Sequence, residues 1–320
     1  MKRSTKIWLI TAASLVLIGC IVFVGVMSML KWDFKKLSTF KYEKNTHEIN
    51  EVFSSITMNT DTADINFMLS NDGKCKVDCY ESENTKHSVT IKENSLIIEK
   101  TDNEPWYKNI GINFGSPKIT VYLPKVEYTS LLIKGNTGDI LIPRNFTFQK
   151  VDISLSTGDV EFYASASESV KIKASTGDID VENISAGSLD LTVSTGEIDV
   201  QGVNCEGDIT VNVSTGEAEL TDLKCKNLIS NGNTGSLSFE NVIAKEKFSI
   251  KRTTGDVKFR SSDAAEISIK TDTGDVVGSL LTDKVFITDT STGKIDVPKT
   301  VTGGKCEIKT DTGKIKITIP

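Results

Sequence analysis

A Thr-Gly pair that recurs at a nearly fixed interval constrains the fold of this chain more than any other feature. Ten such pairs begin at Thr137, Thr157, Thr176, Thr195, Thr215, Thr234, Thr254, Thr273, Thr292 and Thr312. Successive pairs are separated by 19 or 20 residues. A constant period of this length is the sequence signature of a repeat protein, in which one small unit stacks on the next.

Each repeat has the pattern of two short strands joined by a tight turn. The residue three positions after each Thr is apolar: Ile140, Val160, Ile179, Ile198, Ala218, Leu237, Val257, Val276, Ile295 and Ile315. A second apolar column lies six positions before the Thr and contains Val170, Leu189, Ile209, Leu228, Phe248, Ile267, Phe286 and Cys306. Polar residues alternate with the apolar ones, which is typical of strands with one buried face. The Gly suits a corner that requires a positive φ angle.

One such unit cannot bury its own apolar face, whereas stacked units bury a continuous column. We therefore predict an all-β, single-domain parallel β-solenoid with coils of about 19–20 residues. In this prediction each coil pairs with its neighbours in sequence order. At about 4.8 Å per coil, ten coils would form a rod of roughly 50 Å.

The stretch before the regular repeats predicts an irregular beginning of the same solenoid. Asn59–Phe67 resembles a coil corner in which Ala63 replaces the Gly. Further strands are expected at Val89–Lys92, Ser95–Ile98 and Lys118–Leu123. We assign residues 46–130 to irregular N-terminal coils and residues 131–320 to the regular solenoid.

The N-terminus has the character of a membrane segment. Lys2, Arg3 and Lys6 precede an uncharged run over residues 7–30, which is long enough to span a bilayer. The basic flank favours a cytoplasmic tail of residues 1–6, a transmembrane helix at 7–30, a linker at 31–45 and an extracytoplasmic body. Leu17–Cys20 also matches a bacterial lipobox, so a lipoprotein signal region with a lipidated Cys20 is the alternative.

The charge of the chain is negative. The formal net charge is −6, and removal of the three basic residues at the N-terminus leaves about −9 for residues 31–320. Nucleic acid is therefore not an expected partner. The same sign disfavours anionic lipid and polyphosphate cell-wall polymers unless divalent cations intervene.

The repeat units at Ser156–Val160, Ser175–Ile179 and Ser194–Ile198, together with the early version at Asn59–Ile65, resemble a bacterial family of candidate adhesins, or domains of unknown function, with β-strand repeats. The resemblance covers nearly everything after the apolar segment. It implies a β-solenoid with no established catalytic residues, and some family members are linked to cell-envelope stress systems.

Several residue columns are candidates for chemistry. Two positions after the Thr, carboxylates recur at Asp139, Asp159, Asp178, Glu197 and Glu217. Stacked carboxylates could bind calcium, but the alternative is that they are solvated turn residues or accept hydrogen bonds from neighbouring backbone amides. The calcium-binding β-roll signature is absent, and we favour the alternative.

The cysteines suggest core packing and two disulfide candidates. Cys306 lies in the apolar column and is expected in the core. Cys205 and Cys225 fall in a column of small residues on adjacent coils, where a packed corner and a disulfide are both compatible with the spacing. Cys75 and Cys79 are a second candidate pair.

No catalytic, cofactor-binding or metal-ligating residues are predicted. His47 and His87 have no nucleophile nearby in the sequence and are expected at the surface, and no hydrolase, phosphate-loop or metalloprotease motif is present. Trp106, Tyr107 and Phe114 lie in the longest break between strands, where they either cap the core or offer aromatic surface to a ligand.

The leading functional hypothesis is a non-enzymatic, adhesin-like binding or scaffolding protein of the cell envelope, whose partner is an unknown envelope protein or glycan. One alternative is a β-helix enzyme that acts on polysaccharide, since such enzymes share this architecture. The other is a regulatory partner of a membrane signalling complex. Function is expected in departures from the repeat, chiefly residues 100–117, and in outward side chains between the turns.

Overall fold

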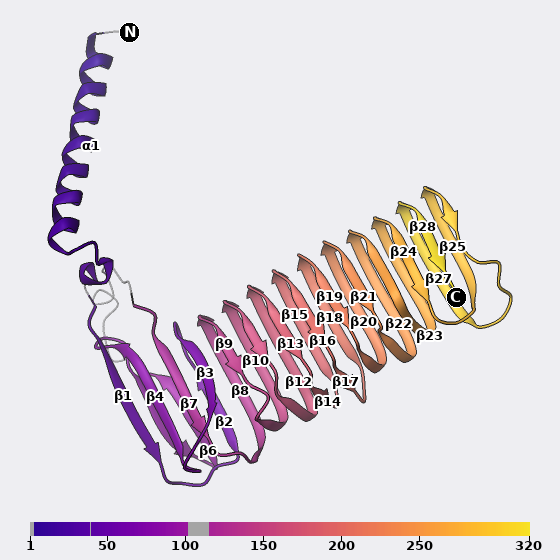
Figure 1. Cartoon of the computed structure of the whole chain (residues 1–320), viewed down its shortest axis with the longest axis horizontal. Helices are drawn as coiled ribbons and strands as arrows, with labels where there is room; N and C mark the ends of the chain where they lie inside the picture. Colours follow the sequence, from indigo (N-terminus) through magenta and orange to yellow (C-terminus); the bar gives the residue numbers. More distant parts are fainter. Residues whose placement is uncertain (1–2, 39, 102–114) are drawn as a thin grey trace.

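The computed structural model describes residues 3–38, 40–101 and 115–320, which form one helix followed by a long β-solenoid (Figure 1). Helix α1 spans Arg3–Met29, and its segment Thr5–Met29 is long and apolar enough to cross a membrane. A short 3-10 helix, η1 (Phe34–Leu37), leads from α1 into the first strand. In Figure 1 the helix departs from the N-terminal end of the solenoid, so the coils extend away from it.

Two sheets form the long faces of the solenoid, and β23 (Val257–Thr273) bends from one into the other. Sheet A contains, in spatial order, β1 (Tyr42–Ile49), β4 (Cys75–Ser82), β7 (Lys118–Leu123), β3 (Asp64–Leu69), β9 (Ile140–Ile142), β11 (Val160–Phe162), β13 (Ile179–Glu182), β16 (Ile198–Gln201), β19 (Ala218–Thr221), β21 (Leu237–Glu240), β23, β24 (Val276–Leu280), β28 (Ile315–Thr318) and β26 (Ile295–Asp296).

Sheet B contains, in spatial order, β5 (His87–Lys92), β6 (Ser95–Lys100), β2 (Ser55–Asn59), β8 (Glu127–Thr137), β10 (Thr147–Thr157), β12 (Ser165–Thr176), β15 (Leu189–Thr195), β18 (Ile209–Thr215), β20 (Lys224–Thr234), β22 (Ile243–Thr254), β23, β27 (Gly304–Thr312) and β25 (Lys284–Thr292). Two short strands, β14 (Ser185–Ala186) and β17 (Asn204–Cys205), extend sheet B at the corner opposite the Thr-Gly turns.

The predicted parallel β-solenoid is confirmed. Equivalent residues pair from coil to coil, so that Thr157 lies beside Thr176 and Thr176 lies beside Thr195. The two apolar columns found in the sequence are buried along most of the rod and form one continuous core. Phe239, Phe248 and Phe259 stack within this core, with ring centroids between 4.8 and 6.1 Å apart.

The glycine of each corner is required by the close approach of neighbouring coils. At Gly177 the φ angle is +126°, and an added Cβ would lie 2.6 Å from the carbonyl carbon of Gly158. Any other residue would combine an unfavourable backbone conformation with a steric clash. The repeat period therefore reflects backbone packing at the corner.

The N-terminal end combines two further layers of parallel strands, β2 with β3 and β6 with β7, with an antiparallel cap. Strands β2 and β3 form the predicted coil around Ala63, in register with the first Thr-Gly coil through a bridge between Thr62 and Thr137. Strands β1, β4 and β5 instead pair antiparallel with their neighbours. These strands cover one open edge of the solenoid, and an uncovered edge is a site of aggregation in β proteins.

At the C-terminal end the stacking order differs from the predicted sequence order. Strand β27 pairs with β23 on one side and with β25 on the other, so the coil of Thr312 lies between the coils of Thr273 and Thr292. Strand β28 is inserted in the same way between β24 and β26. The expectation that each coil stacks on its neighbour in sequence was therefore wrong for the last two coils (Figure 1).

The inward side chains give the physical reason for this order. The inserted coil carries Cys306, Ile308, Ile315 and Ile317, which are all fully or almost fully buried. The coil at the end of the rod has the half-buried Thr288 where the inserted coil has Ile308, and its Phe286 and Val297 are only partly buried. The inserted position buries Ile308 on both sides, while the polar Thr288 tolerates water at the open end.

Candidate functional site

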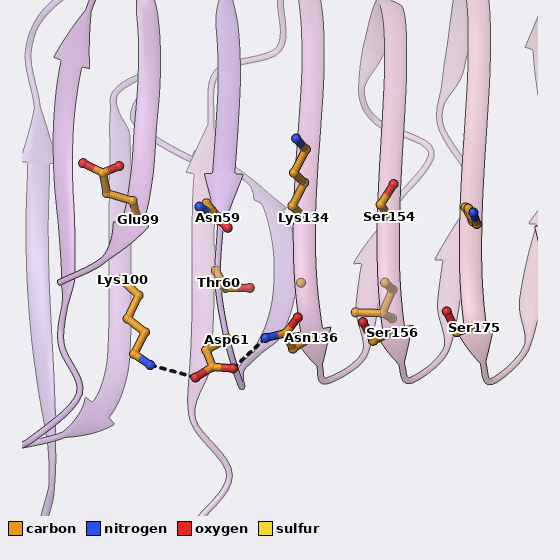
Figure 2. A pocket seen from close by; sticks show the side chains of 13 residues that line it. Asn59, Thr60, Asp61, Glu99, Lys100, Lys134, Asn136, Ser154, Ser156 and Ser175 are labelled. Atoms are coloured by element: carbon orange, nitrogen blue, oxygen red, sulfur yellow. Dashed lines mark hydrogen bonds and ion pairs between the residues drawn. The ribbon is translucent and has the colours of Figure 1, made fainter. Parts of the chain in front are cut away.

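The main polar groove lies on the outer surface of sheet B, where the irregular coils meet the first regular ones. It has a volume of 660 Å³ and is lined by Asn59, Thr60, Asp61, Glu99, Lys100, Lys134, Gly135, Asn136, Ser154, Leu155, Ser156, Lys173 and Ser175. Figure 2 shows these side chains in parallel rows across successive strands. The rows arise because equivalent positions of neighbouring coils lie side by side in register.

One end of the groove is fixed by a charged network. The Lys100 Nζ atom donates to Asp61 Oδ2 at 2.7 Å, and the Asn136 Nδ2 atom donates to Asp61 Oδ1 at 2.9 Å (Figure 2). The hydrogen bond from Lys100, followed by that from Asn136, lowers the pKa of the Asp61 carboxyl below its ordinary value. Asp61 is therefore ionised at neutral pH and holds two side chains from different strands in place.

The floor of the groove is formed at a glycine, which has no side chain. Gly135 occupies an inward-facing position, and an added Cβ would lie 3.0 Å from Leu155 Cδ1 and 3.5 Å from Thr60 Oγ1. The groove thus offers hydroxyl, amide, ammonium and carboxylate groups above a small apolar floor. This chemistry is suited to binding a polar molecule through hydrogen bonds and ion pairs.

The acidic column of the Thr-Gly corners has a structural role. Asp139 Oδ1 accepts a hydrogen bond from the backbone amide of Asp159 at 3.0 Å. In the same way, Asp159 Oδ1 accepts from the amide of Asp178 at 2.8 Å, and Asp178 Oδ1 accepts from the amide of Glu197 at 2.7 Å. The alternative in which these carboxylates accept hydrogen bonds from neighbouring backbone amides is confirmed for Asp139, Asp159 and Asp178. Each Asp ties its corner to that of the next coil.

A second acidic row lies on the outer face of sheet A and contains Glu161, Asp180, Asp199 and Glu219 in register. Partial burial, together with the neighbouring charges of Asp180 and Glu219, raises the pKa of Asp199. The Tyr163 hydroxyl donates to Asp180 Oδ2 at 2.8 Å. Negative charge is thus concentrated on the face opposite the groove.

Comparison with known families decides the assignment. The sequence profile of the Toastrack DUF4097 family matches residues 53–210 and 204–320, which is nearly the whole solenoid. This chain belongs to the Toastrack DUF4097 family. The resemblance to candidate adhesins of unknown function inferred from the repeat units is confirmed.

Several solved structures are similar to this Toastrack chain. A candidate lipid-binding protein from Parabacteroides distasonis is 20% identical, with 74% of this chain and 96% of that chain covered and a TM-score of 0.52. A candidate adhesin from Bacteroides fragilis is 17% identical, with coverages of 87% and 97% and a TM-score of 0.41. A candidate adhesin from Parabacteroides distasonis is 11% identical, with coverages of 85% and 98% and a TM-score of 0.45.

The likeness to the first of these structures shows a shared fold. No curated protein matches the chain. These similar structures are described as candidate adhesins or as a candidate lipid-binding protein.

The cysteines of this Toastrack chain are all free thiols. Cys75 and Cys79 lie four residues apart on the single strand β4, a separation of about 13 Å, which is too far for the candidate disulfide between them. Cys205 and Cys225 lie in the predicted column of small buried residues, beside Ala186 and Ala244 respectively. Burial raises the pKa of the Cys225 thiol to about 12, which disfavours its reactive thiolate form. Cys306 is fully buried in the core, as predicted.

The predicted surface position of His87 was also wrong. Its side chain is 2% exposed, and Nδ1 lies 2.8 Å from Glu81 Oε2, which also accepts the His87 backbone amide at 2.8 Å. The Asn45 Nδ2 atom donates to the other carboxylate oxygen at 2.7 Å. The sequence offered no signal for this pair, because residues outside the regular repeats have no equivalent positions for comparison. Trp106, Tyr107 and Phe114 lie outside the described residues.

Two buried cations in the regular coils were missed by the sequence analysis. Lys284 Nζ lies 2.6 Å from Asp263 Oδ1, with both side chains almost fully buried. Arg252 is 3% exposed and donates from Nη2 to Ser230 Oγ at 3.2 Å. Arg252 stands two positions before its Thr, in an inward column that contains Leu155, Ala174, Val193 and Val213 in earlier coils. The break in that apolar column is the signal that could have revealed it.

Proposed function

We propose that this chain is a non-enzymatic, extracytoplasmic binding or scaffolding protein of the cell envelope, held to the membrane by α1. The observation that carries this proposal is the polar groove of sheet B, which continues into rows of outward polar side chains on successive coils. Repetition of one coil creates a long surface of equivalent positions, and solenoids use such surfaces for binding extended partners.

The helix supports the membrane part of the proposal. The segment Thr5–Met29 has 25 residues. At a rise of about 1.5 Å per residue, a helix of this length is longer than the bilayer core, which is about 30 Å thick. The basic residues before it favour a cytoplasmic N-terminus, which places the solenoid outside the cytoplasm. The uncleaved helix is our proposal over the lipoprotein, because the apolar run continues after Cys20.

Site-specific crosslinking tests the binding role of the groove. In one variant a photoreactive residue replaces Ser156, which lines the groove. In the matched control it replaces Ser167, which is exposed on strand β12 and does not line the groove. In intact cells we expect an adduct with an envelope component from position 156 and not from position 167. Identical adducts from both positions would contradict a specific groove.

A second measurement addresses catalysis. The full chain is incubated with cell-wall and surface glycans, and products are followed by mass spectrometry. Turnover that is abolished by a single carboxylate substitution would replace the binding role with an enzymatic one.

A further inference from the structure

A row of outward side chains with a distinct composition runs along sheet B. It consists of the residue three positions before the Thr in each coil, and we refer to it as the lysine row. In spatial order the row contains Lys134, Ser154, Lys173, Thr192, Asn212, Asn231, Lys251, Lys270, Lys309 and Asp289, each in register with the next. At about 4.8 Å per strand, the row is about 43 Å long.

The charge of the row is opposite to that of the whole chain. It holds five lysines and a single carboxylate, Asp289 at the C-terminal end of the rod, although the formal net charge of the chain is −6. In the part of the chain that the structure describes, Lys134, Lys173, Lys251 and Lys270 form no ion pair, while Lys309 Nζ lies 2.8 Å from Glu307 Oε1. The acidic row of Glu161, Asp180, Asp199 and Glu219 faces the other way, on sheet A.

The spacing of three of these lysines is unfavourable in the free protein. Lys251 lies directly beside Lys270, and Lys270 lies directly beside Lys309, whose other neighbour in the row is Asp289. Like charges directly opposite each other on neighbouring strands are destabilising. An anionic group bound above these strands would relieve this repulsion.

The middle of the row suits hydroxyl groups. Thr192, Asn212 and Asn231 separate the two groups of lysines, and Asn231 Nδ2 donates to Asn212 Oδ1 at 3.0 Å. Hydroxyl and amide side chains both donate and accept hydrogen bonds, which matches the hydroxyl groups of sugars. The row contains no aromatic side chain on which a nucleic acid base could stack.

We propose that the lysine row binds an extended anionic glycan, meaning a hydroxyl-rich chain with repeated carboxylate or phosphate groups, that lies along the solenoid axis. Lys134, Ser154 and Lys173 belong to both the row and the polar groove, so the groove forms one end of this track. The length of one sugar unit in an extended glycan is close to the strand spacing, so successive units meet equivalent positions of successive coils. This proposal rests on the binding role proposed above and names the ligand class.

The test compares two triple variants of the full-length chain in detergent. The first, Lys251→Gln/Lys270→Gln/Lys309→Gln, removes three charges from the row. The matched control, Lys258→Gln/Lys294→Gln/Lys316→Gln, removes three charges at exposed positions on and beside sheet A and gives the same net charge. Fluorescence anisotropy measures binding of labelled polygalacturonate oligomers, glycerol-phosphate oligomers, neutral dextran and a single-stranded oligonucleotide.

We expect the row variant to bind the anionic oligomers about tenfold more weakly and the control to bind almost unchanged, because exposed ion pairs each contribute modestly. Binding should also weaken with salt. Binding of only one of the two anionic oligomers supports the proposal and identifies the anionic group.

Equal losses in both variants, no binding of either anionic oligomer, or equal affinity for the oligonucleotide would overturn the proposal. These results are independent of the crosslinking at Ser156. A specific groove adduct combined with an inactive lysine row would refute the ligand class alone.

Discussion

The buried guanidinium of Arg252 leads to a quantitative prediction. The side chain is 3% exposed, its Nη2 atom reaches Ser230 Oγ, and its Nε and Nη1 atoms have no hydrogen-bond partner among the described residues. Burial lowers the pKa of Arg252 to about 10. At about 1.4 kcal/mol per pKa unit, the buried charge destabilises the fold by about 3 kcal/mol.

Replacement of this residue by a neutral side chain should therefore stabilise the protein. Arg252→Met retains a long apolar side chain and removes the charge, while the lost hydrogen bond to Ser230 costs about 1 kcal/mol. The expected net gain is about 2 kcal/mol, which corresponds to an increase in Tm of about 4 °C. Lys247→Met, at an exposed position on the same strand, should change stability by less than about 0.5 kcal/mol.

The sign of the pH dependence follows from the lowered pKa. Below about pH 10 the folded state carries the full cost of the buried charge, and this cost disappears as the pH rises above about 10 toward the higher pKa of the unfolded state. The advantage of Arg252→Met should therefore be constant between about pH 6 and pH 9. Equilibrium urea unfolding followed by circular dichroism measures it.

Gly232 provides an internal check of the geometry. An added Cβ at Gly232 would overlap Nη1 of Arg252 and would lie 2.5 Å from the carbonyl oxygen of Val213. Gly232→Ala should therefore cost more in the wild-type background than in the Arg252→Met background, which a double-mutant cycle detects. A loss of more than about 1 kcal/mol in Arg252→Met alone would refute the argument, since it would mean that the guanidinium has a buried partner.

Three further predictions concern the corners and the buried acid. Gly196→Ala should destabilise the protein by about 1–3 kcal/mol in urea, because φ is +144° at this position; an unchanged midpoint would contradict the packing argument. Asp178→Ala should lower the free energy of unfolding by about 1 kcal/mol, because the hydrogen bond from the Glu197 amide is lost, while Asp178→Asn should retain most of this stability. A stabilisation by calcium that is seen only in the wild type would indicate a cation site instead. Burial raises the pKa of Glu81, but hydrogen bonds, chiefly from His87, lower this pKa below 4.5 overall. The stability that the Glu81–His87 pair provides is therefore present above about pH 4.5, and it is lost as the pH falls through the lowered pKa of Glu81 in the folded protein. Glu81→Gln should remove this part of the acid dependence in thermal unfolding, and an identical acid profile would argue against it.

Much of the candidate surface could be predicted from the repeat. Once the Thr of each coil is aligned, Lys134, Lys173, Lys251 and Lys270 fall at one position, and stacking alone places them in one row. The negative net charge of the chain argued against an anionic partner. A sum over all residues does not show that basic and acidic side chains are separated between the outer faces of sheet B and sheet A. The orientation of each sheet was needed to separate the lysine row from the acidic row of sheet A.

The groove and the buried pairs were less accessible to sequence analysis. Asp61, Lys100 and Asn136 come from different strands and meet only because β2 lies between β6 and β8. Glu81 and His87 lie outside the repeats, so no column of equivalent residues reveals that they are buried.

The sequence by itself determined the cross-section of the coil, since the Thr-Gly period, the alternating apolar columns and the corner glycine all specify the same backbone path. The tertiary structure decided the order in which coils stack at the two ends. Coils with the same cross-section can pair in any order with similar backbone hydrogen bonding, so the period cannot distinguish between these orders. Burial of Cys306, Ile308, Ile315 and Ile317 on both sides favours the inserted position of the last coil, and this difference exists only once the neighbouring coils are in place.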